Sequence, residues 1–332
     1  MLRSSLMVIK ILRVLLFFAF AKALISCNTA ANNDVDVSKV QVNSQLFAFH
    51  EDFANANSEN LTTLKATYPN FFATRVPDSV WIARLSGKDT IQNVLEDAVR
   101  KKNFDLKKIE AQVVDVMQHV KYYFPEFKET PIYTIISEVD RKNRIIAGPE
   151  ELIVSIDTYL GKDHELYQGI SAYQREHLNP SQIPADVAMA YAKLFVEPTM
   201  DRTFLGSMIY HGKLHYLQTL FAPQAAGATI FEYEPEKYDY MLTNEAEIWR
   251  YFVDVDLLYS TDSRLLARFI MPAPFSKFYL EVDQETPGGA ARYIGYRIVA
   301  SYMEYNKQTT LDQLLNLEAD VLFNKSKYKP KQ

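Results

Sequence analysis

The spacing of apolar residues predicts a chain built mostly of helices. Apolar positions recur every three or four residues over 91–99 and again over 106–124, which gathers the apolar side chains on one helix face. A further helix is expected near Pro184, because proline is favoured at first-turn positions. The second half is expected to be almost entirely helical, with amphipathic segments over 203–221, 244–258, 264–270, 287–305 and 311–323.

Two short β-branched runs interrupt this helical pattern. Residues 132–137 and 152–157 are compact apolar segments, preceded by Pro131 and Pro149 respectively, and such runs are typical of buried strands. The sequence therefore predicts an α+β, helix-dominated fold. We expect a single domain over 46–324, with a small sheet-containing lobe at about 46–200 followed by a helical lobe at about 201–324.

The amino terminus carries the pattern of a bacterial lipoprotein signal peptide. Basic residues precede an apolar run over 14–21, and Leu24-Ile25-Ser26-Cys27 resembles a lipobox, whose cysteine is lipidated before the peptidase cuts. The apolar run is too short to cross a hydrocarbon core, which needs about 20 residues. We therefore expect residues 1–27 to be removed and Cys27 to anchor the chain by lipid in the cell envelope, facing the periplasm. The alternative is a cytosolic protein in which this single cysteine is buried.

Composition narrows the function further. The first 27 residues hold four basic and no acidic residues, so the remaining chain has 32 basic and 41 acidic residues, a net charge of −9. This balance argues against a nucleic-acid partner, which needs a basic surface. With one cysteine there is no disulfide framework. The sequence also lacks a glycine-rich loop of the kind that binds nucleotides. Residues 28–45 are polar and predict a flexible tether, and the lysine-rich residues 325–332 predict a frayed tail.

The segment His211-Gly212-Lys213-Leu214-His215 contains the most specific chemical pattern. Histidines four residues apart lie one turn apart on a helix face and can bind one zinc ion. Both continue the apolar stripe of the 203–221 helix, so they are expected to face inward. Glu245, on the next predicted helix, is expected to face inward as well and is a candidate third ligand. Gly212 occupies the position at which zinc peptidases of the His-Glu-x-x-His type carry their catalytic glutamate.

Structural alternatives stand beside this metal hypothesis. Either histidine can be a core residue bonded to a carbonyl group, and Glu245 can simply favour the positive end of a helix. Asn244 with Glu247 makes a plausible capping pair. Other candidates are weaker: there is no Gly-x-Ser-x-Gly elbow. The acidic residues around 254–262 suit helix capping better than calcium binding, and His164 suits a solvated turn.

Several segments together resemble the gliding-motility lipoprotein GldB family. The matching segments are 68–72 (Tyr-Pro-Asn-Phe-Phe), 153–162 (Ile-Val-Ser-Ile-Asp-Thr-Tyr-Leu-Gly-Lys), 203–209 with Gly212 and Lys213, 244–249, 256–262, 273–280, 285–288, 294–299 and 328–331. The same framework is similar to a wider group of predicted zinc-dependent peptidases. That resemblance implies a zincin-like fold, with His211, His215 and Glu245 at the metal position and hydrolysis lost through Gly212.

The resemblance implies a lipid-anchored component of the gliding machinery and its associated secretion apparatus. We expect it to act by contacts with other envelope proteins, with no catalytic residues and no required cofactor. The alternative is a zinc-dependent, metallopeptidase-like hydrolase of the envelope, and a third reading is a carrier that binds an extended peptide. Residue 212 discriminates between the first two, because glycine can neither orient nor deprotonate a metal-bound water.

Overall fold

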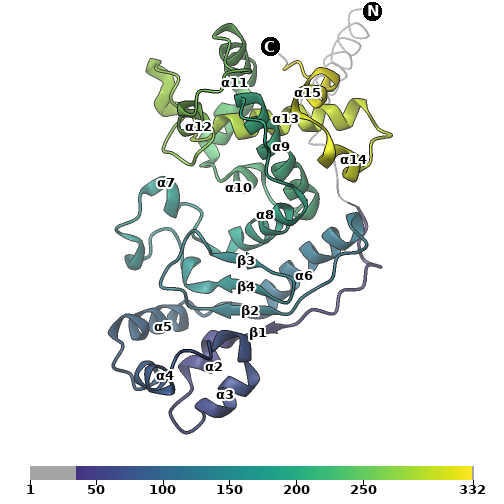
Figure 1. Ribbon diagram of the computed structural model, residues 1–332. Helices are drawn as coiled ribbons and strands as arrows, with labels where there is room; N and C mark the ends of the chain where they lie inside the picture. Colours follow the sequence, from purple (N-terminus) through teal and green to yellow (C-terminus); the bar gives the residue numbers. More distant parts are fainter. Residues whose placement is uncertain (1–34, 331–332) are drawn as a thin grey trace, which may run out of the picture. The chain divides into compact units, whose positions relative to one another are not determined.

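The computed structural model describes residues 35–330, which belong to one compact unit (Figure 1). The predicted signal peptide, the lipidation residue Cys27 and the first part of the predicted tether lie outside the described residues. Among those described, no helix is long and apolar enough to cross a membrane.

Five helices occupy the chain between the first two strands. They are α2 (Phe49–Ala54), α3 (Leu61–Thr67), α4 (Asp78–Leu85), α5 (Thr90–Lys102) and α6 (Leu106–Tyr123). The start of α5 is fixed by Asp89, whose side chain accepts a hydrogen bond from Gln92 N at 3.1 Å, a standard N-cap. Asn103 ends α5 in the left-handed conformation. The helices predicted over 91–99 and 106–124 are confirmed, whereas α2, α3 and α4 were not predicted because they are short and irregularly patterned.

The sheet has four strands in the order β1-β2-β4-β3 (Figure 1). These strands are β1 (Leu46–Phe47), β2 (Ile132–Ile135), β3 (Ile145–Ala147) and β4 (Leu152–Ser155). Strands β1, β2 and β4 are parallel, with Ile132 opposite Leu152, and β3 is antiparallel to β4. The two predicted strands are confirmed. Strands β1 and β3 were missed because two or three residues are too few to show an alternating pattern.

Helices account for most of the chain after β4. They are α7 (Ala172–Arg175), α8 (Ile183–Phe195), α9 (Phe204–Phe221), α10 (Gly227–Phe231), α11 (Pro235–Asp254), α12 (Arg264–Phe269), α13 (Ala290–Tyr305), α14 (Leu311–Asn316) and α15 (Ala319–Ser326). The α+β, helix-dominated fold class is therefore confirmed. Figure 1 shows α9–α15 on the β3 side of the sheet and α2–α5 on the β1 side.

Two helices in this half differ from the prediction. Helix α11 begins at Pro235, and Asn244, the predicted capping residue, instead forms a kink inside it (φ −107°, ψ 16°). The predicted 311–323 helix is two helices, because Leu317 takes an extended conformation (φ −72°, ψ 137°). Asp262, one of the acidic residues predicted to cap the following helix, lies one residue before its N-cap Ser263, and its carboxylate accepts a hydrogen bond from Arg264 N at 2.9 Å.

Both predicted flexible ends are partly wrong. From residue 35 onward the predicted tether packs on α6: Gln118 donates to the Val40 carbonyl at 2.9 Å and Lys121 to the Gln41 carbonyl at 3.0 Å. At the other end, α15 continues to the buried Ser326, and the Tyr328 hydroxyl donates to Glu245 at 2.8 Å. Long-range hydrogen bonds, which local composition does not encode, order both segments.

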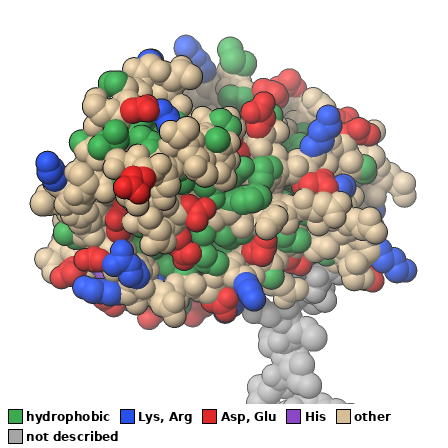
Figure 2. Space-filling view, turned by 90° about the horizontal axis from the view of Figure 1, so that it is seen from below, with side chains coloured by type: hydrophobic (Ala, Val, Ile, Leu, Met, Phe, Trp, Pro, Cys, Tyr) green, Lys and Arg blue, Asp and Glu red, His purple; other side chains and the backbone are tan. Residues whose placement is uncertain are grey.

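Helix α9 links two of the three hydrophobic clusters. Its first half, including Leu205 and Met208, packs with α11–α13, while its second half, including Leu217 and Phe221, packs with α6, α8 and the sheet. A smaller cluster around Phe53 lies among α2, α3 and α4. The face seen in Figure 2, viewed from below Figure 1, shows apolar side chains between acidic and basic ones. Exposed apolar side chains on α4 and α5 are Val80, Ile82, Ile91 and Val94.

Candidate functional site

Helix α9 places His215 in the interior and leaves His211, one turn earlier, half-buried. Its start is fixed by Thr203, whose hydroxyl accepts a hydrogen bond from Gly206 N at 2.9 Å. His215 is only 2% exposed, and its Nδ1 lies 2.9 Å from Gln218 Oε1. Because Gln218 donates its amide to the Ala185 carbonyl, its oxygen faces the ring. His215 Nδ1 must therefore carry the proton, which leaves a lone pair on Nε2.

Both histidines are held in the neutral form. Burial, together with the positive charge of Arg292, lowers the pKa of His215 to about 3 and that of His211 to about 4. Neutral imidazole is the form that binds metals. The nearby guanidinium works in the opposite direction, because it raises the energy of any added cation. The Nε atom of Arg292 is itself buried without a hydrogen-bond partner among the described residues.

Glu245, the predicted third ligand, is buried as expected but has other partners. Its carboxylate accepts hydrogen bonds from Arg297 Nε at 3.0 Å, the Tyr293 hydroxyl at 3.1 Å and the Tyr328 hydroxyl at 2.8 Å. These contacts tie α11 to α13 and to the carboxyl-terminal segment. Within residues 35–330, no three His, Cys, Asp or Glu side chains are grouped so that they could hold a metal ion.

The residues between the histidines have structural roles. At Gly212, a Cβ atom would lie 2.4 Å from both the carbonyl carbon and oxygen of Gly295, and at Gly295 it would lie 1.9 Å from the Met208 carbonyl oxygen. Helices α9 and α13 therefore cross in backbone contact, and only glycine fits at this crossing. A glutamate at position 212 would have to displace α13.

Lys213 joins α9 to α14. Its buried ammonium donates to the carbonyl oxygens of Leu315 at 2.9 Å and Leu317 at 2.7 Å, groups that the end of a helix leaves without intrahelical partners. Burial lowers the pKa of Lys213, yet these two acceptors satisfy the charged form. Lys213, the third residue of the motif, thus caps the end of a neighbouring helix.

A buried ion cluster that the sequence did not reveal lies next to this region. Arg144, which precedes β3, bridges Asp186 of α8 at 2.7 Å and Glu232, which follows α10. Tyr159 and Gln182 donate to the same Asp186 carboxylate at 2.8 and 3.1 Å. We name these five residues the Arg144 cluster.

The Arg144 cluster contains one positive charge and two carboxylates, and Arg292, outside the cluster, supplies a second positive charge near Glu232. Burial alone would raise the pKa of Glu232, but the positive charges of Arg144 and Arg292 bring it down to about 2. Burial raises the pKa of Asp186, and Arg144 partly offsets that effect. Breaking such a buried pair on one side leaves an uncompensated charge, which typically costs about 3–5 kcal/mol. The cluster therefore holds α8, β3 and the residue after α10 in one arrangement.

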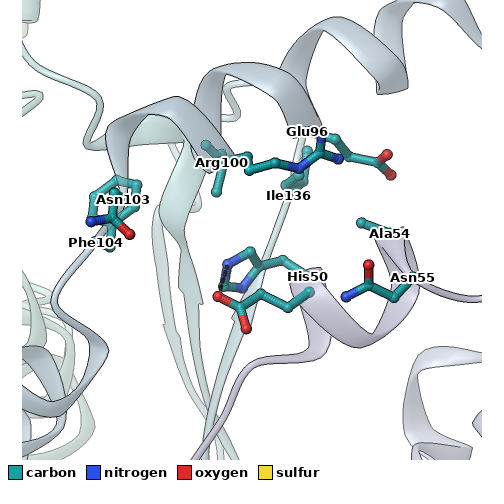
Figure 3. Close-up of a pocket in the computed structure, with 10 residues that line it drawn as sticks. His50, Ala54, Asn55, Glu96, Arg100, Asn103, Phe104 and Ile136 are labelled. Carbon is teal, nitrogen blue, oxygen red and sulfur yellow. Dashed lines mark ion pairs between the residues drawn. The ribbon is translucent and has the colours of Figure 1, made fainter.

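A separate pocket of about 290 Å³ opens where β1 and β2 end (Figure 3). Helix α2 supplies His50 and Glu51, and α5 supplies Glu96 and Arg100. Ile136, which follows β2, also lines the pocket. Crevices beside the carboxyl ends of parallel strands are common ligand sites in α/β sheets. The sequence prediction missed this pocket because its walls come from segments more than 80 residues apart.

The loop beside the pocket is strained. Glu138 and Val139 both have positive φ angles, 59° and 60°, which is uncommon for any residue other than glycine and unusual for β-branched valine. The buried Asp157 carboxylate holds this loop by accepting hydrogen bonds from Val139 N at 2.7 Å and Ser137 N at 3.0 Å. Asp157 therefore positions the segment that follows Ile136.

These features define a helix-dominated α+β domain in which the segment between the two histidines serves helix packing. Residues 30–330 match the family described as Gliding motility protein GldB. The chain belongs to this family, and it is accordingly a gliding motility protein. No curated protein and no solved structure matches the chain.

Proposed function

We propose that the chain acts in the gliding machinery as a lipid-anchored envelope protein, through contacts with other envelope proteins and without catalysis. The anchor would be Cys27, and the folded domain would face the periplasm. We further propose that the domain is a degenerate relative of the zincins, in view of two histidines one turn apart on α9 and a buried glutamate on α11.

The glycine crossing carries the non-catalytic part of this proposal. A metallopeptidase of this type needs a general base beside its first metal ligand, and that position is filled by Gly212 in backbone contact with Gly295. No rearrangement of one side chain can supply the base. The charge of Arg292 beside both histidines also works against a bound zinc ion.

Exposed apolar residues support a role through contacts. Tyr279 is 75% and Leu280 is 54% exposed, and the guanidinium of Arg268 lies 4.6 Å from the centre of the Tyr279 ring. Tyrosine and arginine are enriched among residues that dominate binding energies at protein interfaces. An aromatic ring held in place on the surface loses little conformational entropy when a partner covers it.

Two experiments test the proposal. In the first, a peptide library is digested with the purified chain in added zinc, and we expect no cleavage. Cleavage that a chelator and His215→Ala both abolish would establish the hydrolase instead. In the second, cells lacking the native protein receive Tyr279→Ser/Leu280→Ser or the control Met200→Ser, whose side chain is 93% exposed. At equal protein levels, we expect only the double variant to lose gliding; unimpaired gliding would refute a contact role for this surface.

A further inference from the structure

The pocket between α2 and α5 contains a histidine nitrogen with an unused lone pair. His50 Nδ1 lies 2.7 Å from Thr134 Oγ1, and the Thr134 hydroxyl donates to the Phe47 carbonyl at 3.5 Å. A hydroxyl group has one proton to donate, so a Thr134 hydroxyl turned toward Phe47 assigns the donor role in this contact to Nδ1. Burial lowers the pKa of His50 to about 4. The ring is therefore neutral at neutral pH, with its Nε2 as an acceptor.

A carboxylate lies opposite this acceptor. Glu51 Oε1 is 3.9 Å from His50 Nε2, which is too far for a hydrogen bond, and two acceptors do not attract each other. Figure 3 shows His50 on the α2 side of the pocket, and Glu51, the next residue of α2, also lines it. A donor group placed between them would satisfy both, and the separation suits one nitrogen with at least two N–H bonds.

The other charged groups of the pocket add to the preference for a cation. Glu96 lines it as a second carboxylate and accepts one hydrogen bond, from Gln92 at 2.8 Å. Arg100 is the basic residue in the lining, and it already donates to Asp97 at 2.9 Å. The rim therefore offers two carboxylates against one guanidinium that is already paired.

The remaining walls are apolar. Val99, Phe104, Ile136 and Ala54 line the pocket together with the amide side chains of Asn55 and Asn103. The volume of about 290 Å³ lies at the lower end of the range for small-molecule pockets. It therefore suits a group of side-chain size. A metal ion is a poorer fit, since no set of three metal-ligating side chains is grouped anywhere in residues 35–330.

We propose that this pocket binds a primary ammonium group on an aliphatic stem. The ammonium donates to His50 Nε2 and to the Glu51 carboxylate, and the stem lies against Val99 and Ile136. Such a group comes either from a lysine side chain of a peptide or from a free alkylamine. The inference does not depend on the proposed envelope contacts, because it follows from the pocket's own donors and acceptors.

The test uses the full chain in detergent micelles with isotope-labelled isoleucine and valine methyl groups. Three probes are titrated: Nα-acetyl-lysine methylamide, whose side-chain amine is free, the Nα-acetyl-norleucine analogue that lacks this amine, and pentane-1,5-diamine. We expect the two amines to shift the Ile136 and Val99 methyl signals in a saturable way, and the norleucine analogue to bind at least about tenfold more weakly. Tighter binding of the acetyl-lysine probe than of the diamine points to a peptide source, and the reverse points to a free amine. Equal binding of the lysine and norleucine probes overturns the proposal.

A matched pair of variants locates the charge. Glu51→Gln keeps the shape of the side chain and removes its charge, and we expect it to weaken amine binding by about tenfold, the order of one charge-assisted hydrogen bond. Glu59→Gln, an exposed carboxylate in the turn after α2, should leave amine affinity unchanged. Because both side chains are exposed, neither variant should unfold the protein. Unaltered amine affinity in Glu51→Gln, or an equal loss in Glu59→Gln, overturns the assignment.

Discussion

The backbone contact between α9 and α13 makes Gly212→Ala the most informative single substitution. The added Cβ would lie 2.4 Å from the carbonyl carbon and oxygen of Gly295, more than 1 Å inside an ordinary contact. The neighbouring atoms belong to a helix backbone, so they can move only if α13 moves. Inserting a methyl group into a packed interior typically costs about 1–3 kcal/mol.

Helix propensity works in the other direction. Replacing a glycine inside a helix by alanine stabilises that helix by about 0.5–1 kcal/mol, because the unfolded chain becomes less flexible. The steric cost falls on rigid backbone and is therefore expected at the upper end of its range. The net expectation is a loss of about 2 kcal/mol of unfolding free energy, or roughly 3 °C in Tm, because the unfolding entropy is about 2 cal/mol/K per residue.

The measurement is chemical and thermal denaturation of Gly212→Ala and Gly295→Ala, with Gly169→Ala as the control. Gly169 has a negative φ and open space where its Cβ would lie, so that substitution should be neutral or slightly stabilising. The double variant should cost less than the sum of the two single variants, since both relieve the same contact by separating the helices. A Gly212→Ala protein as stable as the native chain would show that the two helices do not touch at this point.

Three further predictions follow from the anchor, the lysine cap and the buried histidines. Cys27→Ala should abolish lipid labelling and leave an unprocessed precursor, as seen on a metabolic-labelling gel; normal processing would disprove the lipobox. Lys213→Met should cost about 1–3 kcal/mol in denaturant melts, because the carbonyl oxygens of Leu315 and Leu317 lose their donor while buried; an unchanged midpoint would mean that water replaces the ammonium. The folded-state pKa values of His211 and His215 lie below the unfolded value of 6.5, so the unfolded chain binds more protons as pH falls and stability should decline from pH 6.5 toward pH 5. A His211→Gln/His215→Gln variant should show a shallower decline in urea melts across that interval, and an identical slope would place both rings in contact with solvent.

The longest elements could be predicted because their patterns are local. The apolar repeat of 106–124 and the β-branched run at 152–157 identify α6 and β4 without reference to the rest of the chain. Strand β1 has two residues, and its conformation is set by pairing with β2 across more than 80 residues. The carboxyl-terminal lysines looked solvated by composition, yet Tyr328 is ordered by Glu245, which is 83 residues away.

The candidate site also has features that the local sequence predicts and features that it does not. Helical spacing alone predicts that His211 and His215 face the interior, and it also places Gly212 and Gly295 inside two helices. A glycine in a helix interior signals close packing, so the crossing had a visible trace in the sequence, although the partner helix did not. The Arg144 cluster left no such trace in the sequence. Arg144 is 42 residues from Asp186 and 88 residues from Glu232 along the chain.

The way in which the amino-terminal segment joins the domain has a mechanical consequence. A pull on residue 35 reaches the hydrogen bonds of Val40 and Gln41 with α6 before it reaches β1, which pairs with β2 through two residues only. The pull meets these attachments one after another along the chain, so they are strained before the glycine crossing and the Arg144 cluster. In a protein of a motile apparatus, this segment would detach first under tension, which would lengthen the chain and leave the rest of the fold intact.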